Sequence, residues 1–168
     1  LDPNRPSSPL TSGLLTGSER SVSDVIGSAI GVLYVQHLSE KQYTEASRYQ
    51  DIYFDFNGFY SGPLMNLQRI IDLNMDEETK DDVLSGGSNE NQIAVARILK
   101  AYFYGVMTDR WGDLPYTEAL QGEDDFSPAY DSQEFIYNDL LNELKEAAAQ
   151  IDINTPGVGG DILFQGDM

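Results

Sequence analysis

The sequence predicts an all-α fold in which antiparallel helix pairs are joined by long loops. Apolar residues recur at the spacing of an α-helix in four separate segments, with polar or acidic connectors between them. The third segment is apolar around its whole circumference, which is typical of a helix that other helices surround. Glycine and proline follow its end, where they stop a helix. These observations indicate one packed helical array.

The first predicted helix covers residues 21–39, and residues 1–20 are predicted to form an extended tether. The opening LDPNRPSSPL is rich in proline and serine, a composition unlike the start of a domain. Ser21 and Asp24 approximate a capping box at the start of the helix. The apolar face of this helix contains Val22, Val25, Ile26, Ala29, Ile30 and Leu33.

An aromatic segment, residues 41–60, leads to the second predicted helix at 59–74. The run YFDFNG at 53–58 is too polar for a buried strand and too aromatic for an ordinary loop. Within the helix, Pro63 is acceptable only in the first turn, because proline lacks the backbone donor of a helix interior. The apolar face of this helix contains Leu64, Leu67, Ile70 and Ile71.

The third predicted helix extends from an N-cap at Ser88 to Arg110, after an acidic connector at 74–89. Gly112 suits a left-handed C-cap, and Pro115 prevents the helix from continuing. Arg110 is favourable at the negative end of the helix dipole. The apolar residues of its first part are Ile93, Ala94, Ala96, Ile98, Leu99, Ala101, Phe103, Val106 and Met107.

The fourth predicted helix begins at Asp131 or Ser132, and Glu134 stands where a capping box requires it. A glycine-rich loop at 155–160 follows the helix. It leads to apolar residues 162–164, which are predicted to start a short extended segment. The residues expected to be buried in this helix are Ile136, Leu140, Leu144, Ala147, Ala148 and Ile151.

Three motifs occur in order along the chain. The first covers residues 94–116 and ends in DRWGDLPY, the second is YDSQEFIYNDL from Tyr130, and the third is GDILFQGDM at 160–168. Together they resemble the SusD/RagB family, glycan-capturing outer-membrane lipoproteins of Bacteroidetes. A structural role in the first motif is expected for Arg97, Tyr102, Asp109, Arg110, Gly112, Asp113 and Pro115.

The resemblance implies a tetratricopeptide-like domain of helix pairs over residues 21–168. It also implies a cell-surface lipoprotein that captures an oligosaccharide or polysaccharide, performs no chemistry on it, and passes it to a SusC-like TonB-dependent outer-membrane transporter. In the family, an N-terminal lipid anchor that is absent from this sequence provides the contact with the membrane. Family members contain several hundred residues, so the chain is expected to be a fragment that corresponds to their N-terminal portion.

The composition argues against a nucleic-acid partner. The chain has 28 acidic and 10 basic residues and a formal net charge of −18, and such a surface repels phosphate backbones. Because it has no cysteine, disulfides, thiol catalysis and cysteine-ligated metals are excluded. No signal peptide is recognised, and no apolar run approaches the roughly 18 residues of a membrane-spanning helix.

Signals for catalysis, a metal site or a cofactor are weak, and none of the three is predicted. Asp124 and Asp125 are adjacent acids in a polar loop and are expected to be solvated rather than to form a glycosidase pair. His37 has no second histidine with which to share a metal. Residues 72–76 resemble the start of an EF-hand loop, but the glycine and glutamate that such a loop requires are missing.

Two places are candidates for sugar binding, which needs aromatic rings beside carboxylate or amide groups. One is the aromatic segment, with the residues Tyr53, Phe54, Asp55, Phe56 and Asn57. The other is Trp111, whose flat face suits a pyranose ring. The alternative for both places is structural. The aromatic residues would then pack under the helices, and Trp111 would fill the junction between the third and fourth helices while Arg110 and two aspartates pair around it.

Three functional interpretations remain open. The leading one is a non-enzymatic glycan-capture protein. A second is a helical-repeat adaptor that binds only protein, or a RagB-like protein that binds a peptide instead of a sugar. The third is a glycosidase that uses Asp124 and Asp125.

Overall fold

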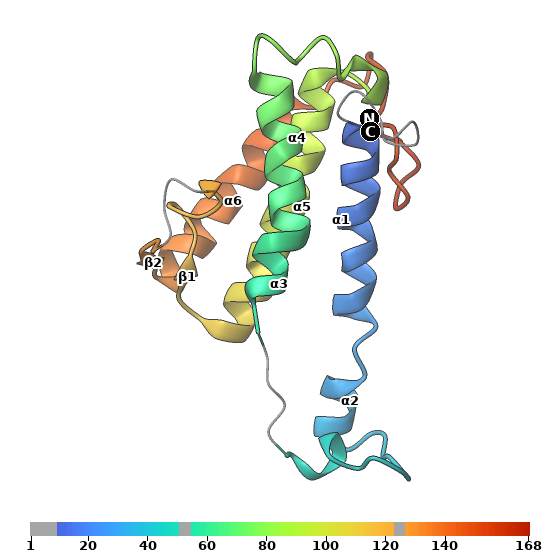
Figure 1. Ribbon diagram of the computed structural model, residues 1–168, viewed down its shortest axis with the longest axis vertical. Helices are drawn as coiled ribbons and strands as arrows, with labels where there is room; N and C mark the ends of the chain where they lie inside the picture. The colour runs from blue at the N-terminus through green and yellow to red at the C-terminus, as the bar shows by residue number, and fades with distance from the viewer. Residues whose placement is uncertain (1–9, 51–54, 123–126) are drawn as a thin grey trace, which may run out of the picture.

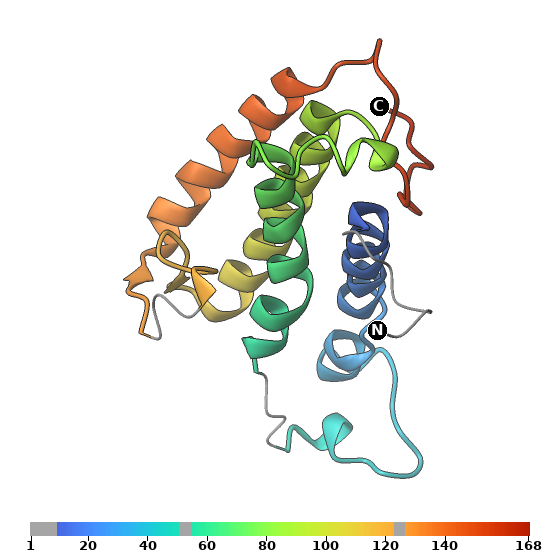
Figure 2. The same cartoon turned by 45° about the horizontal axis from the view of Figure 1, so that its top comes forward.

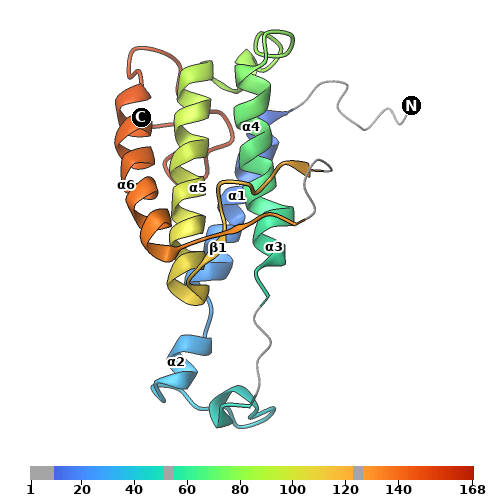
Figure 3. The same ribbon diagram turned by 90° about the vertical axis from the view of Figure 1, so that its left-hand side faces the viewer.

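In the computed structural model, which describes residues 10–50, 55–122 and 127–168, four long helices lie side by side. They are α1 (Thr11–Ile26), α4 (Met65–Met75), α5 (Asn89–Trp111) and α6 (Gln133–Gln150). Consecutive long helices run in opposite directions (Figure 1), and the turned views show the same arrangement (Figure 2, Figure 3). Helix α4 packs against both α1 and α5, and α5 also packs against α6. The predicted all-α fold of antiparallel helix pairs is therefore confirmed.

Helix α1 begins at Thr11 instead of residue 21, so residues 11–20 are helical and not part of an extended tether. Leu15 and Val22 bury one face of this helix in the core. The Ser18 hydroxyl donates to the Leu14 carbonyl at 2.9 Å, which satisfies a polar group inside the helix. The serine-rich composition did not indicate a helix here, because this helix is stabilised by tertiary packing and not by local propensity.

The first helix was also predicted to reach residue 39, but the structure breaks it at Gly27, where helix propensity is low. A short helix α2 (Ile30–Tyr34) and a 3-10 turn η1 (Ala46–Arg48) follow. This part of the chain projects beyond the end of the bundle (Figure 1, Figure 3). The Tyr49 hydroxyl donates to the Tyr34 carbonyl at 2.9 Å and ties the two turns together.

The second predicted helix, at 59–74, contains a kink. A single turn, α3 (Asn57–Phe59), leads into a π-helical turn, η2 (Tyr60–Leu64), which continues into α4. Gly62 has non-helical dihedral angles (φ −110°, ψ −107°) immediately before Pro63. Proline disfavours the α conformation in the residue that precedes it, which explains the position of the kink.

Both ends of α5 lie within one residue of the prediction. The Ser88 side chain accepts a hydrogen bond from the backbone N–H of Asn91 at 3.3 Å. At the other end Gly112 has a positive φ, +77°, as the predicted left-handed C-cap requires, but its ψ of −123° lies outside the left-handed α region. Although α5 has 23 residues, no helix in the described ranges is long and apolar enough to cross a membrane. Its buried apolar residues are Ala94, Ala96, Leu99, Ala101, Phe103, Tyr104 and Met107.

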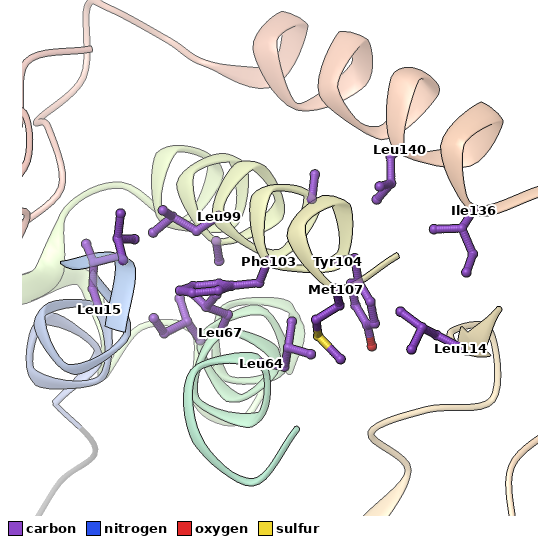
Figure 4. Close-up of a cluster of buried hydrophobic side chains, with 14 of the residues drawn as sticks. Leu15, Leu64, Leu67, Leu99, Phe103, Tyr104, Met107, Leu114, Ile136 and Leu140 are labelled. Atoms are coloured by element: carbon purple, nitrogen blue, oxygen red, sulfur yellow. The ribbon is translucent and has the colours of Figure 1, made fainter. Parts of the chain in front are cut away.

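The core lies where α1, α4 and α6 surround α5. Phe103 is fully buried at its centre, and Figure 4 shows its ring above Leu67 of α4, with Leu15 of α1 to one side. Ile136 and Leu140 of α6 close the other side of α5. The apolar circumference predicted for the third helix is therefore explained by neighbours on several sides.

Of the two predicted starts of this helix, Asp131 and Ser132, the N-cap of α6 is Ser132, whose side chain accepts a backbone hydrogen bond of 3.3 Å. Two short strands, β1 (Leu114–Pro115) and β2 (Tyr130–Asp131), pair antiparallel just before it. The prediction that Leu144 and Ala148 are buried was wrong: both are exposed on α6, Leu144 by 39%.

The segment after α6, residues 151–168, turns back to the N-terminal end of α1 (Figure 1). The Thr16 hydroxyl donates to the Gly160 carbonyl at 2.6 Å. Residues 162–164 form bends instead of the extended segment that was predicted. The reason is local: the Asp161 carboxylate accepts the backbone N–H groups of Leu163 and Phe164, both at 2.9 Å, and this curls the chain.

Candidate functional site

Arg97, in the first motif, joins α5 to α6. Its guanidinium donates two hydrogen bonds to the Glu143 carboxylate, at 2.9 and 2.8 Å, and one to Glu146 at 2.8 Å. A fourth, at 3.2 Å, reaches Gln150. The guanidinium holds the pKa of the Glu143 carboxyl below its ordinary value, mainly through these hydrogen bonds. The predicted structural role of Arg97 is therefore to clamp two helices.

The turn after α5 holds the start of α6. The Asp113 carboxylate accepts the backbone N–H of Gln133 at 2.9 Å, and Asp109 accepts the Tyr137 hydroxyl. The two aspartates were expected to pair with Arg110 around Trp111. The structure shows both aspartates binding groups of α6, and the positive end of the α6 dipole favours this position for Asp113.

Trp111 packs towards α3, not into the junction between α5 and α6 where the structural alternative placed it. Its ring makes edge contacts with Phe56 and Phe59, with centroids 5.7 and 6.0 Å apart. The Arg110 guanidinium lies 5.3 Å from the centre of the Trp111 ring. Tyr102 contacts Phe103 in a similar edge arrangement at 5.4 Å.

The structure brings together two of the predicted sugar-binding residues that are far apart in the sequence, Phe56 and Trp111. Asp55 and Asn57 are both exposed beside them, and the Asp55 carboxylate accepts the backbone N–H of Asn57 at 2.7 Å. The remaining candidates, Tyr53 and Phe54, lie outside the described residues, and so do Asp124 and Asp125.

A hollow of about 290 Å³ opens beside Phe56 and Asn57. The η2 turn adds Tyr60 and Ser61 to its lining, and the loop after β1 adds Glu118. Trp111 does not line this hollow; it contacts the Phe56 ring that does. Tyr60 could have been suspected from the aromatic segment, whereas nothing local in the sequence indicated Glu118.

The hollow combines the groups that sugars require. The Tyr60 hydroxyl donates to the Pro115 carbonyl at 2.6 Å, which fixes the ring, and burial raises the pKa of this hydroxyl so that it stays protonated. The Phe56 ring contacts the Tyr60 ring edge to face at 5.9 Å. Apolar rings therefore lie beside the Asn57 amide and the Glu118 carboxylate. This arrangement suits hydroxyl groups on an otherwise apolar ring.

Comparison with solved structures finds similar folds. A chitin-binding protein matches with a TM-score of 0.69 and 25% identity over 94% of this chain and 34% of its own. A SusD-like protein of Bacteroidetes AC2a matches with a TM-score of 0.64 and 26% identity, over 95% of this chain and 30% of its own. A SusD homolog of Bacteroides fragilis matches with a TM-score of 0.71 and 23% identity, over 95% of this chain and 32% of its own. The chain thus spans about a third of the length of each of these proteins.

Comparison with curated proteins gave no match. A family model named SusD-like_2, described as starch-binding and associating with the outer membrane, matches residues 3–168. The match covers all four long helices, the Arg97 clamp and the turn after α5. The chain belongs to the SusD-like family.

Proposed function

We propose that the chain binds an oligosaccharide or polysaccharide at the cell surface and holds it for uptake through a SusC-like TonB-dependent transporter. The single observation that carries the proposal is the hollow in which the rings of Phe56 and Tyr60 lie beside the amide of Asn57. The family description and the chitin-binding relative support the choice of a sugar as ligand. In this function the protein holds its ligand and leaves the glycosidic bonds intact.

Titration of the chain with maltohexaose and with chitohexaose tests the proposal. Trp111 is the only tryptophan, and it contacts Phe56, so its fluorescence reports on this site. We expect a saturable change with at least one of the two probes. Phe56→Ala should weaken binding about tenfold, the equivalent of about 1.4 kcal/mol.

Two further variants make this test specific. Asn57→Ala removes an exposed amide without removing an aromatic contact, so weaker binding by this variant cannot be attributed to a damaged core. Phe164→Ala is the matched control, because that ring is 72% exposed and does not line the hollow. Equal losses in Phe56→Ala and Phe164→Ala would contradict the proposed site.

The outer face of α6 favours a protein partner in addition to the sugar. Tyr137 and Leu141 are 41% and 57% exposed there, one helical turn apart, and Leu144 follows on the same face. Apolar groups gathered on one face are typical of a protein interface. We assign this face to the transporter. Binding of a purified SusC-like transporter should be lost in Leu141→Lys, while sugar titration should be unchanged; retained binding would reject the assignment.

A further inference from the structure

A larger groove, of about 780 Å³, lies between α4, α5 and α6. Figure 3 shows these three helices side by side, with the segment that contains β1 crossing their face. Ile71 of α4, Ile93 of α5 and Leu140 of α6 contribute apolar walls. The volume falls in the upper part of the range for small-molecule sites, roughly 300–1,000 Å³.

The groove is connected to the hollow beside Phe56 by a row of aromatic rings. Within this row, Tyr60 contacts Tyr104 at 6.1 Å, and Tyr104 contacts Tyr116 at 4.7 Å, both edge to face. Tyr60 lines the hollow, whereas Tyr104 and Tyr116 line the groove. Residues 119–121 line both. The two cavities are therefore adjacent, and the row of contacting tyrosine rings extends from one to the other.

The charged groups that line the groove cancel. Arg97 and Lys100 are balanced by Glu143 and Asp139. Arg97 is bound to Glu143, and Asp139 accepts the Tyr116 hydroxyl at 2.7 Å. An anionic ligand would find no net positive charge here, and the net charge of −18 on the whole chain adds repulsion.

Lys100 is the least satisfied of these groups. Its half-buried ammonium donates to the neutral Gln68 amide oxygen. Burial lowers the pKa of Lys100, and the carboxylates of Glu143 and Asp72 act in the opposite direction. An ammonium has three donors, so it retains capacity for hydroxyl oxygens of a ligand. Thr117 and three glutamines, Gln68, Gln121 and Gln150, add neutral polar groups to the lining of the groove.

We propose that this groove is a second glycan subsite, which takes an uncharged oligosaccharide segment of about two or three sugar rings. The inference rests on the proposed function and extends it, because the same glycan would occupy the hollow beside Phe56 and the groove beyond residues 119–121. Balanced charge selects neutral sugars, the tyrosine rings supply apolar contact, and the amides and Lys100 supply hydrogen bonds.

Blocking the groove tests the proposal. Ile93→Trp places a bulky indole at a position whose side chain lines the groove but not the hollow. Ile153→Trp makes the same change at a side chain that is 74% exposed and lines neither cavity, and it serves as the matched control. Because both variants introduce a second tryptophan, binding is measured by calorimetry, with maltohexaose, chitohexaose and hexagalacturonate as probes.

We expect Ile93→Trp to weaken binding of the neutral hexasaccharide about tenfold or more and Ile153→Trp to leave it unchanged. We also expect hexagalacturonate to bind the unmodified chain more weakly than the neutral probes. Gln68→Ala, which removes a hydrogen-bonding side chain from the groove without adding bulk, should weaken binding in the same direction. Circular dichroism verifies that each variant is folded.

Three results would overturn the inference, and only the first of them would also reject the proposed function. If neither neutral probe binds the unmodified chain, both the proposed function and the second subsite are rejected. If Phe56→Ala weakens binding but Ile93→Trp and Gln68→Ala do not, the proposed function stands and the groove is not a subsite. If hexagalacturonate binds more tightly than the neutral probes, the assigned ligand class is wrong.

Discussion

Replacement of Arg97 by methionine removes the clamp between α5 and α6 and leaves Glu143 half-buried without its partner. The Arg97 side chain is 20% exposed and that of Glu143 is 35% exposed. Exposed ion pairs contribute roughly 0–1 kcal/mol, and removal of one partner from a buried pair costs roughly 3–5 kcal/mol. Arg97 lies between these limits, so we expect Arg97→Met to lower the free energy of unfolding by about 2 kcal/mol.

Urea unfolding, followed by circular dichroism and by Trp111 fluorescence, measures this loss. For a chain of this size, about 2 kcal/mol corresponds to a fall in Tm of roughly 4–8 °C. Lys80→Met is the matched control: it breaks the exposed pair of Lys80 with Glu77, which lie 2.6 Å apart, and should have no measurable effect. A double-mutant cycle with Glu143→Gln should show coupling between Arg97 and Glu143.

Two outcomes would refute this reasoning about Arg97. One is a loss in Arg97→Met no larger than that in Lys80→Met. The other is strict additivity of Arg97→Met and Glu143→Gln, which would show that the two side chains do not act as a pair.

Three other predictions concern stability. Burial raises the pKa of Glu19 to about 7 from 4.5, so the stability that this group contributes is present below pH 4.5 and lost as pH rises through 7. Glu19→Gln should remove about 3 kcal/mol of this pH dependence in urea unfolding at pH 4.5 and 8. Phe103→Ala should cost about 3–5 kcal/mol in the same assay, because the ring is fully buried; a loss below 1 kcal/mol would contradict the described core. Gly160→Ala should lower Tm, since Gly160 has φ +84° and a Cβ there would meet the backbone of Ser12, whereas Gly31→Ala, with open space around it, should not.

The long central helix was predictable because its ends depend on local chemistry. The hydroxyl of Ser88 and the positive φ of Gly112 act within one turn of their own positions, and the sequence contains everything they need. The start of α1 was not predictable in this way. Ser18 and Glu19 look like surface residues, yet they are buried because η2 and the segment after α6 cover them.

The site was predictable only in part for the same reason. Phe56 and Asn57 stood out as an aromatic ring beside an amide. The contact of Phe56 with Trp111 joins α3 to the end of α5, and Glu118 reaches the hollow on the loop after β1. Contacts between segments so distant in the sequence leave no local periodic pattern. The proposed groove depends on three helices and a loop and was therefore invisible in the sequence.

The central claim is that this chain holds a glycan in the hollow beside Phe56. The most direct test is an NMR titration of the isotope-labelled chain with maltohexaose and chitohexaose. We predict saturable shifts of the backbone amides of Asn57, Ser61 and residues 118–121 with at least one probe. Absence of shifts with both probes, or saturable shifts confined to the outer face of α6, would contradict it.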